Sequence, residues 1–106
     1  MILKDATALD LLLTGNTHVL AMAGGVEASI YYQTAATAFM ALPDGTRRHG
    51  TWQVTATGYH VDWQGGPSAD WQIDVEPGMM LYRDAEGVER ARVSRIVPGD
   101  AAGLAT

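Results

Sequence analysis

The stretch that decides the fold class spans residues 59–64 and reads Tyr59-His60-Val61-Asp62-Trp63-Gln64. Apolar and polar side chains alternate strictly along it, which is the pattern of a β-strand with one buried and one solvated face. Residues 70–75 repeat this alternation in the order Asp-Trp-Gln-Ile-Asp-Val. Gly65-Gly66-Pro67 separates the two runs, and such residues favour a tight turn. The two runs are therefore predicted to be neighbouring antiparallel strands.

The same pattern extends in both directions along the chain. Short runs rich in β-branched and aromatic residues, bounded by Gly, Pro and Asp, predict strands over residues 17–23, 26–33, 36–42, 50–55, 59–64, 70–75, 79–83 and 88–97. No helical pattern separates these runs, so parallel β-α-β units are not expected. The sequence predicts a mainly β protein with an antiparallel up-and-down meander of about eight strands, and closure into a small barrel would remove its exposed edges.

The N-terminal segment departs from the strand pattern. Asp5 is a good N-cap, and Leu9, Leu12 and Leu13 fall on one face at helical spacing. A helix over about residues 5–14 is therefore predicted, and a helix this short needs a surface on which to bury its leucines. We expect one β domain over residues 1–106, with this helix against one face or one end of the sheet and a loose tail of small residues at 101–106.

Composition and charge exclude several classes of protein. The chain has 106 residues, of which 47% are hydrophobic and 18% charged, as in a globular domain. Its formal net charge of −5 argues against nucleic-acid binding and against docking on anionic membranes. No apolar run approaches the ~20 residues of a membrane span. The first residues lack a secretory signal, so we expect a cytoplasmic location, or a periplasmic one if a signal peptide was removed.

Aromatic residues form the strongest candidate for a binding site. Alternation places Tyr59 and Trp63 on one inward face, and Trp71 faces inward on the next strand. Together with Trp52 they are the predicted ligand-binding residues, lining a pocket for a small hydrophobic or aromatic ligand. The other interpretation is an ordinary packed core, because side chains usually fill a barrel of this size. The sequence leaves both interpretations open.

Polar residues give weaker signals. His60 and Asp62 share a strand face, as in a general base or half of a metal site, but that face opposes the aromatic one and favours an ordinary surface pair. His18 and His49 are isolated, with no metal-ligand spacing. Arg90 and Arg92 suit cross-strand ion pairs, or an anion site together with Arg48.

No catalytic signature is present. The glycine pairs lack the Lys-Ser/Thr of a phosphate loop, the serines have no nucleophile-elbow context, and there is no cysteine. We therefore predict a protein that is not an enzyme, with no catalytic residues, no metal site and no cofactor.

Several short motifs occur in a familiar order. They are Leu12-Leu13-Thr14-Gly15-Asn16-Thr17, Pro43-Asp44-Gly45-Thr46, Gly50-Thr51-Trp52 and Val97-Pro98-Gly99-Asp100. This order resembles a family of small, uncharacterised bacterial β domains, many of them exported, and spans about residues 5 to 100. The resemblance implies a lipocalin-like meander and no assigned activity. Relatives tend to carry two cysteines where this chain has Tyr59-His60-Val61 and Asp70-Trp71, so the disulfide they imply is absent here.

Two functions follow as hypotheses. The first is a binding module that holds a small apolar ligand between the tryptophans. The second is a structural or protein-interaction module without catalytic activity, such as a homodimer, in which the apolar run Met79-Met80-Leu81-Tyr82 forms an exposed interface edge.

Overall fold

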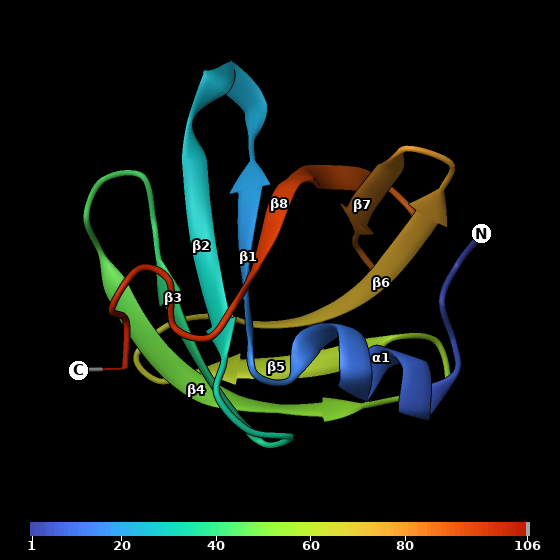
Figure 1. Cartoon of the computed structure of the whole chain (residues 1–106), viewed down its shortest axis with the longest axis horizontal. Coiled ribbons are helices and arrows are strands. Elements are labelled where there is room, and N and C mark those ends of the chain that lie inside the picture. The colour runs from blue at the N-terminus through green and yellow to red at the C-terminus, as the bar shows by residue number, and fades with distance from the viewer. Residues whose placement is uncertain (106) are drawn as a thin grey trace.

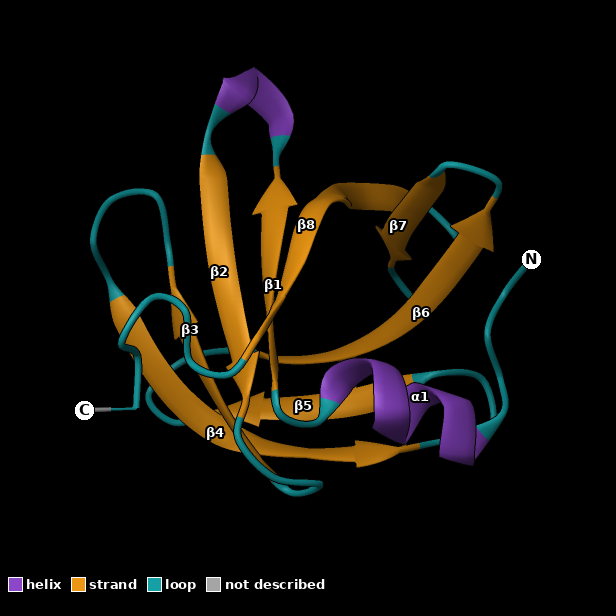
Figure 2. Cartoon of the chain, in the orientation of Figure 1, coloured by secondary structure: helices purple, strands orange, loops and turns teal. Residues whose placement is uncertain are grey.

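The computed structural model describes residues 1–105 (Figure 1). One α-helix, one 3₁₀ turn and eight strands follow one another along the chain (Figure 2). Their bounds are α1 Ala6–Leu13, β1 Asn16–Ala21, η1 Ala23–Gly25, β2 Glu27–Tyr32, β3 Thr37–Ala41, β4 Arg47–Val54, β5 Tyr59–Trp63, β6 Ser68–Glu76, β7 Met79–Arg83 and β8 Glu89–Pro98.

The strands close into a barrel. Each strand pairs antiparallel with the next in sequence, and β1 also pairs with β8, opposing Thr17 to Val97 and His18 to Ile96. The prediction of a mainly β, antiparallel up-and-down barrel is thus confirmed. Because consecutive strands run in opposite directions, the β1–β2, β3–β4, β5–β6 and β7–β8 connections gather at one end, and α1 lies at the other.

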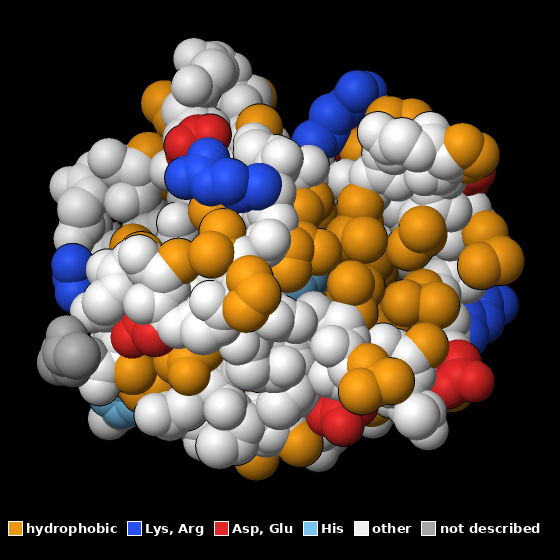
Figure 3. Space-filling view, in the orientation of Figure 1, with side chains coloured by type: hydrophobic (Ala, Val, Ile, Leu, Met, Phe, Trp, Pro, Cys, Tyr) orange, Lys and Arg blue, Asp and Glu red, His pale blue; other side chains and the backbone are white. Residues whose placement is uncertain are grey.

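The helix forms where the sequence predicts it. The Asp5 carboxylate accepts hydrogen bonds from the backbone N–H groups of Thr7 and Ala8, at 2.9 and 3.1 Å, and so caps the first turn. Leu9 and Leu13 are fully buried in the barrel core. The helix covers part of its end of the barrel, and beside it apolar side chains gather towards β7 and β8 (Figure 3).

The alternation in β5 is confirmed, since Tyr59, Val61 and Trp63 are all buried. Strand β4 begins at residue 47, three residues before the predicted start at 50, because Arg48 and His49 pair with Met40 and Phe39 of β3. This longer strand brings Arg48 onto the same inward face as Gly50 and Trp52.

The prediction that Met79–Tyr82 forms an exposed edge is wrong. Strand β7 pairs with β6 on one side and with β8 on the other, and Leu81 and Tyr82 are buried.

The prediction of a loose tail at 101–106 is also wrong for residues 101–105. The Asp100 carboxylate accepts hydrogen bonds from the backbone N–H groups of Leu104 and Ala105, at 2.8 and 2.9 Å, and Leu104 is buried. Residue 106 lies outside the described residues.

Gly50 marks a close approach between β4 and β5. A methyl group at this position would lie 2.2 Å from the Asp62 carbonyl oxygen, so Gly50→Ala forces the two backbones apart. We expect this variant to lower the free energy of unfolding by about 1–3 kcal/mol, as for overpacked interiors, measured by urea denaturation. The matched control is Thr51→Ala, an exposed change in the same strand, with an expected effect of about 0.5 kcal/mol or less. Equal effects in the two variants would contradict the close approach.

Candidate functional site

The barrel interior has two halves of different character. The half next to α1 is solidly packed and contains a chain of buried polar side chains. The opposite half contains an apolar cavity that opens between the hairpin connections. Tyr82 belongs to both halves, because its ring lines the cavity and its hydroxyl joins the polar chain.

The polar chain links the helix to four strands. The Leu12 carbonyl contacts His18 Nε2 at 3.1 Å, and His18 Nδ1 contacts the Tyr82 hydroxyl at 2.8 Å. The chain continues from the Tyr82 hydroxyl to that of Tyr32 at 2.8 Å and from there to that of Tyr59 at 2.6 Å. All four side chains are fully buried or nearly so. Their rings pack edge to face, for example His18 on Tyr32 with centroids 5.3 Å apart.

The Leu12 carbonyl sets the direction of every hydrogen bond in this chain. A carbonyl oxygen only accepts, so Nε2 of neutral His18 carries the proton and Nδ1 is an acceptor. The Tyr82 hydroxyl must then donate to Nδ1, which leaves its oxygen to accept from Tyr32. By the same argument the Tyr32 oxygen accepts from Tyr59. Each hydrogen bond therefore points the same way, from Tyr59 towards the Leu12 carbonyl, and every buried donor of this polar chain has an acceptor.

Burial holds all four groups neutral. Removal from water lowers the pKa of His18 to about 4, and the bond to the Leu12 carbonyl opposes this shift only in part. Burial also raises the pKa values of Tyr32, Tyr59 and Tyr82 above their usual range. The chain is thus an uncharged network at neutral pH, suited to fixing rings in place rather than to acid–base chemistry.

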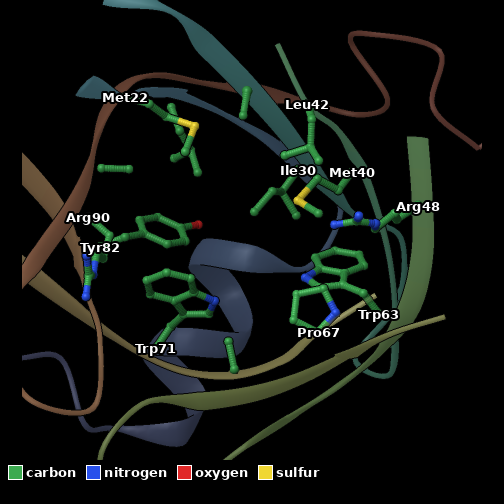
Figure 4. Close-up of a pocket in the computed structure, with 14 residues that line it drawn as sticks. Met22, Ile30, Met40, Leu42, Arg48, Trp63, Pro67, Trp71, Tyr82 and Arg90 are labelled. Carbon is green, nitrogen blue, oxygen red and sulfur yellow. The ribbon is translucent and has the colours of Figure 1, made fainter. Parts of the chain in front are cut away.

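The cavity has a volume of about 200 Å³ and lies at the end opposite α1, which crosses behind it in Figure 4. Aliphatic and aromatic side chains make up most of its wall: Leu20, Met22, Ala28, Ile30, Met40, Leu42, Pro67, Ala69 and Ala91. The polar groups in the lining are Arg48, Trp63, Trp71, Tyr82 and Arg90. This is an apolar chamber with a few polar groups at defined places, which is the usual composition of a small-molecule site.

A β-bulge brings Arg90 to the cavity. Tyr82 pairs with Ala91 and Arg83 with Glu89, which leaves Arg90 as an extra residue in β8. Strict alternation would send Arg90 and Ala91 to opposite faces, yet both line the cavity. Bulges commonly redirect side chains in this way. Arg92 does not line the cavity, and its Nε bonds Glu89 at 3.1 Å.

The four aromatic residues predicted to bind a ligand fall into two pairs. Trp63 and Trp71 line the cavity. Trp52 and Tyr59 lie in the packed half, with ring centroids 5.7 Å apart, and Trp52 Nε1 donates to the Thr34 carbonyl oxygen at 2.9 Å. Two of the four residues thus line a cavity and two belong to the packed core, and ligand binding by them stays a prediction.

His60 lies on the outer surface, as the alternation predicts. Its Nδ1 contacts Asp70 at 2.8 Å and its Nε2 contacts Asp62 at 3.0 Å. The bonds to Asp70 and then Asp62 raise the pKa of His60, and both ring nitrogens are occupied. This geometry is that of a surface ion-pair cluster. Among residues 1–105, no group of three His, Asp or Glu side chains is placed to hold a metal ion.

One feature of the interior lies beyond the sequence reasoning above. The His18–Tyr82–Tyr32–Tyr59 chain joins residues up to 64 positions apart, and no local pattern indicates that they meet. Of the three arginines considered as an anion site, Arg48 and Arg90 line the cavity and Arg92 does not. Extending the alternation of Trp52 and Gly50 back by two residues places Arg48 on the inward face.

Comparison of the chain with protein-family models, curated proteins and solved structures finds no match. In the part of the chain that the structure describes, no helix has the length and apolar character needed to span a membrane.

The direction of the polar chain can be tested with two tyrosine variants. Tyr59→Phe removes only a terminal donor, so it should cost about 0.5–1.5 kcal/mol of the free energy of unfolding. Tyr82→Phe leaves His18 Nδ1 without a donor and the Tyr32 hydroxyl without its acceptor, and should cost about 2–4 kcal/mol. Urea denaturation measures both. A greater loss for Tyr59→Phe than for Tyr82→Phe would show that the order of the chain is wrong.

His18 also predicts a pH dependence. Unfolded His18 binds a proton near pH 6.5 and folded His18 only near pH 4, so the unfolded state binds more protons between these values. The contribution of His18 to the free energy of unfolding is therefore fully retained above pH 6.5 and is lost as the pH is lowered. Between pH 7.5 and pH 5 this loss amounts to about 2 kcal/mol. His60 acts in the opposite direction because its pKa is raised in the folded protein.

Urea denaturation of a His60→Gln variant at several pH values measures the His18 contribution without the opposing effect of His60. In parallel, ¹⁵N NMR of the histidine ring should show His18 neutral and protonated on Nε2 down to about pH 4. A His18 titration near pH 6.5 in the folded protein would contradict the buried chain.

Proposed function

We propose that the protein binds a small, largely apolar ligand in the cavity at the open end of the barrel. The observation that carries this proposal is the cavity itself, which is lined by Trp63, Trp71 and aliphatic side chains, within a domain whose other half is solidly packed. A site of this kind, concave and apolar with a few polar groups, is where a small domain gains most from excluding water.

The size of the cavity limits the ligand. An apolar cavity of about 150 Å³ accommodates benzene in a protein interior. The 200 Å³ here suits a single aromatic ring with a short substituent, or an acyl chain of similar size. Because the cavity is open to solvent at the hairpin end, a polar substituent can remain at the mouth while the ring is buried.

The packed half supports binding by keeping the cavity in shape. Tyr82 lines the cavity, and its hydroxyl is fixed by the chain to His18 and Tyr32. Trp71 packs edge to face on Tyr82, with ring centroids 6.1 Å apart. A wall whose rotamers are already fixed loses little conformational entropy when a ligand arrives.

The interaction-module hypothesis loses the feature that motivated it, because Leu81 and Tyr82 are buried in a strand paired on both sides. Homodimer formation stays a prediction without a specific surface. Membership of the lipocalin-like family also stays a prediction, and a ligand cavity at one end of the barrel accords with it.

Ligand binding is tested by fluorescence titration with 2-phenylethanol, a neutral single-ring compound. Trp63 and Trp71 should report its entry through a saturable change in emission. Ala69→Leu places a larger side chain in the cavity wall and should weaken binding by about tenfold or more, as expected when apolar contacts are replaced. Ala35→Leu, the same substitution at an exposed site outside the cavity, is the control and should bind normally. No saturable change with the wild type, or equal binding by Ala69→Leu, would overturn the proposal.

A further inference from the structure

The polar groups that line the cavity share one property, which is that all of them are hydrogen-bond donors. They are the Arg48 and Arg90 guanidinium groups and the Trp63 and Trp71 indoles, whereas the hydroxyl of Tyr82, whose ring also lines the cavity, is occupied by His18 and Tyr32. No Asp or Glu lines the cavity, although the chain has twelve acidic residues against seven basic ones. The lining is therefore positive within a protein of net negative charge.

The two indole N–H groups have no acceptor. Neither Trp63 Nε1 nor Trp71 Nε1 makes a hydrogen bond with any residue in 1–105, whereas Trp52 Nε1 bonds the Thr34 carbonyl oxygen at 2.9 Å. Trp63 is only 7% exposed, but no unpaired side-chain nitrogen is sealed from solvent within residues 1–105, so its N–H is accessible from the cavity side. In Figure 4 the nitrogen of each cavity indole lies on the side of its ring that faces the other tryptophan across the cavity. Both donors thus point into the space that a ligand would occupy.

Arg48 is the cation best placed to meet a ligand. It is half-buried, and it extends from β4 over Trp63 towards the cavity (Figure 4). It makes no hydrogen bond or salt bridge with any residue that the structure describes. The nearby Asp44 is an exposed turn residue whose carboxylate accepts from the Thr46 backbone N–H at 2.9 Å. A side chain at residue 66 would contact the Arg48 guanidinium at 2.9 Å, so Gly66 leaves the space in which Arg48 lies.

Arg90 has a different role at the rim. Its Nε bonds the Asp84 carboxylate at 2.9 Å, and its side chain is 57% exposed. Its charge is therefore largely compensated and screened by water. Arg48 makes no ion pair of this kind within residues 1–105, and its charge acts only at longer range on Asp44, whose pKa is lowered mainly by the hydrogen bonds from Thr46 and least by Arg48.

We propose that the ligand is a small organic carboxylate, an acid with a single ring or short acyl chain whose carboxylate binds Arg48 and the indole N–H groups of Trp63 and Trp71. This inference rests on the ligand-binding function proposed above. A carboxylate only accepts hydrogen bonds, and its two oxygens match the parallel donors of a guanidinium group. The apolar body fills the cavity below, and the carboxylate supplies the acceptors that the indoles lack. An ammonium ligand of the same shape would meet only donors and a like charge.

Three compounds of nearly equal shape test the charge preference: phenylacetate, 2-phenylethanol and 2-phenylethylammonium. Calorimetric titration at pH 7.5 and low salt should give an affinity for phenylacetate about tenfold or more above that for 2-phenylethanol, with 2-phenylethylammonium weakest. Added salt should weaken phenylacetate binding and leave 2-phenylethanol binding unchanged.

Arg48→Gln identifies the residue responsible. It should lower the ratio of the affinity for phenylacetate to that for 2-phenylethanol by about tenfold or more, because only the carboxylate uses the guanidinium charge. Arg92→Gln removes the same charge outside the cavity and is the matched control, with little effect on either compound. Thermal unfolding of both variants establishes that they are folded before titration.

The outcomes separate the two proposals. If 2-phenylethanol binds and phenylacetate binds no better, the carboxylate inference is wrong and the ligand-binding function stands. If phenylacetate is preferred but Arg48→Gln retains that preference, the assignment to Arg48 is wrong. If none of the three compounds binds, the carboxylate inference and the binding of single-ring ligands both fail.

Discussion

The hydrogen bond between the Leu12 carbonyl and His18 is the constraint on which the rest of the interior depends. It fixes the histidine tautomer, and through it the direction in which Tyr82, Tyr32 and Tyr59 donate. One contact therefore connects α1 to β1, β7, β2 and β5. An apolar barrel would be held by packing alone, which tolerates several similar arrangements, whereas a fully satisfied polar network accepts only one. Because the Tyr82 ring lines the cavity, the same hydrogen bonds also fix the position of that part of the cavity wall.

The division of the barrel into two halves follows from its topology. In an up-and-down barrel the hairpin connections alternate between the ends, so one end can be filled by the N-terminal helix while the other stays open. Leu9 and Leu13 fill the first end, and the space left at the second is the cavity. The packed core and the cavity thus lie at different ends of the same eight strands.

The parts of this structure that were predictable are those with a local cause. The alternation of residues 59–64 predicts the strand and its buried face, and Asp5 with the leucines at helical spacing predicts α1. The cavity was only half predictable, because alternation shows that Trp52, Tyr59, Trp63 and Trp71 point inward but not how deep each lies. Depth depends on strand register around the closed barrel, which brings together residues remote in sequence. The bulge that turns Arg90 towards the cavity also arises from pairing and has no signature in β8 itself.

The polar chain has a further consequence for the helix. Within α1 each backbone N–H donates towards the N-terminus, and the carbonyl groups at its last turn form the negative end of the helix dipole. His18, Tyr82, Tyr32 and Tyr59 donate in the same sense, one after another, onto the Leu12 carbonyl. A helix of only eight residues is in effect prolonged across the barrel by four side chains. Its negative end is thereby carried from the helix terminus to the Tyr59 oxygen, inside the buried core.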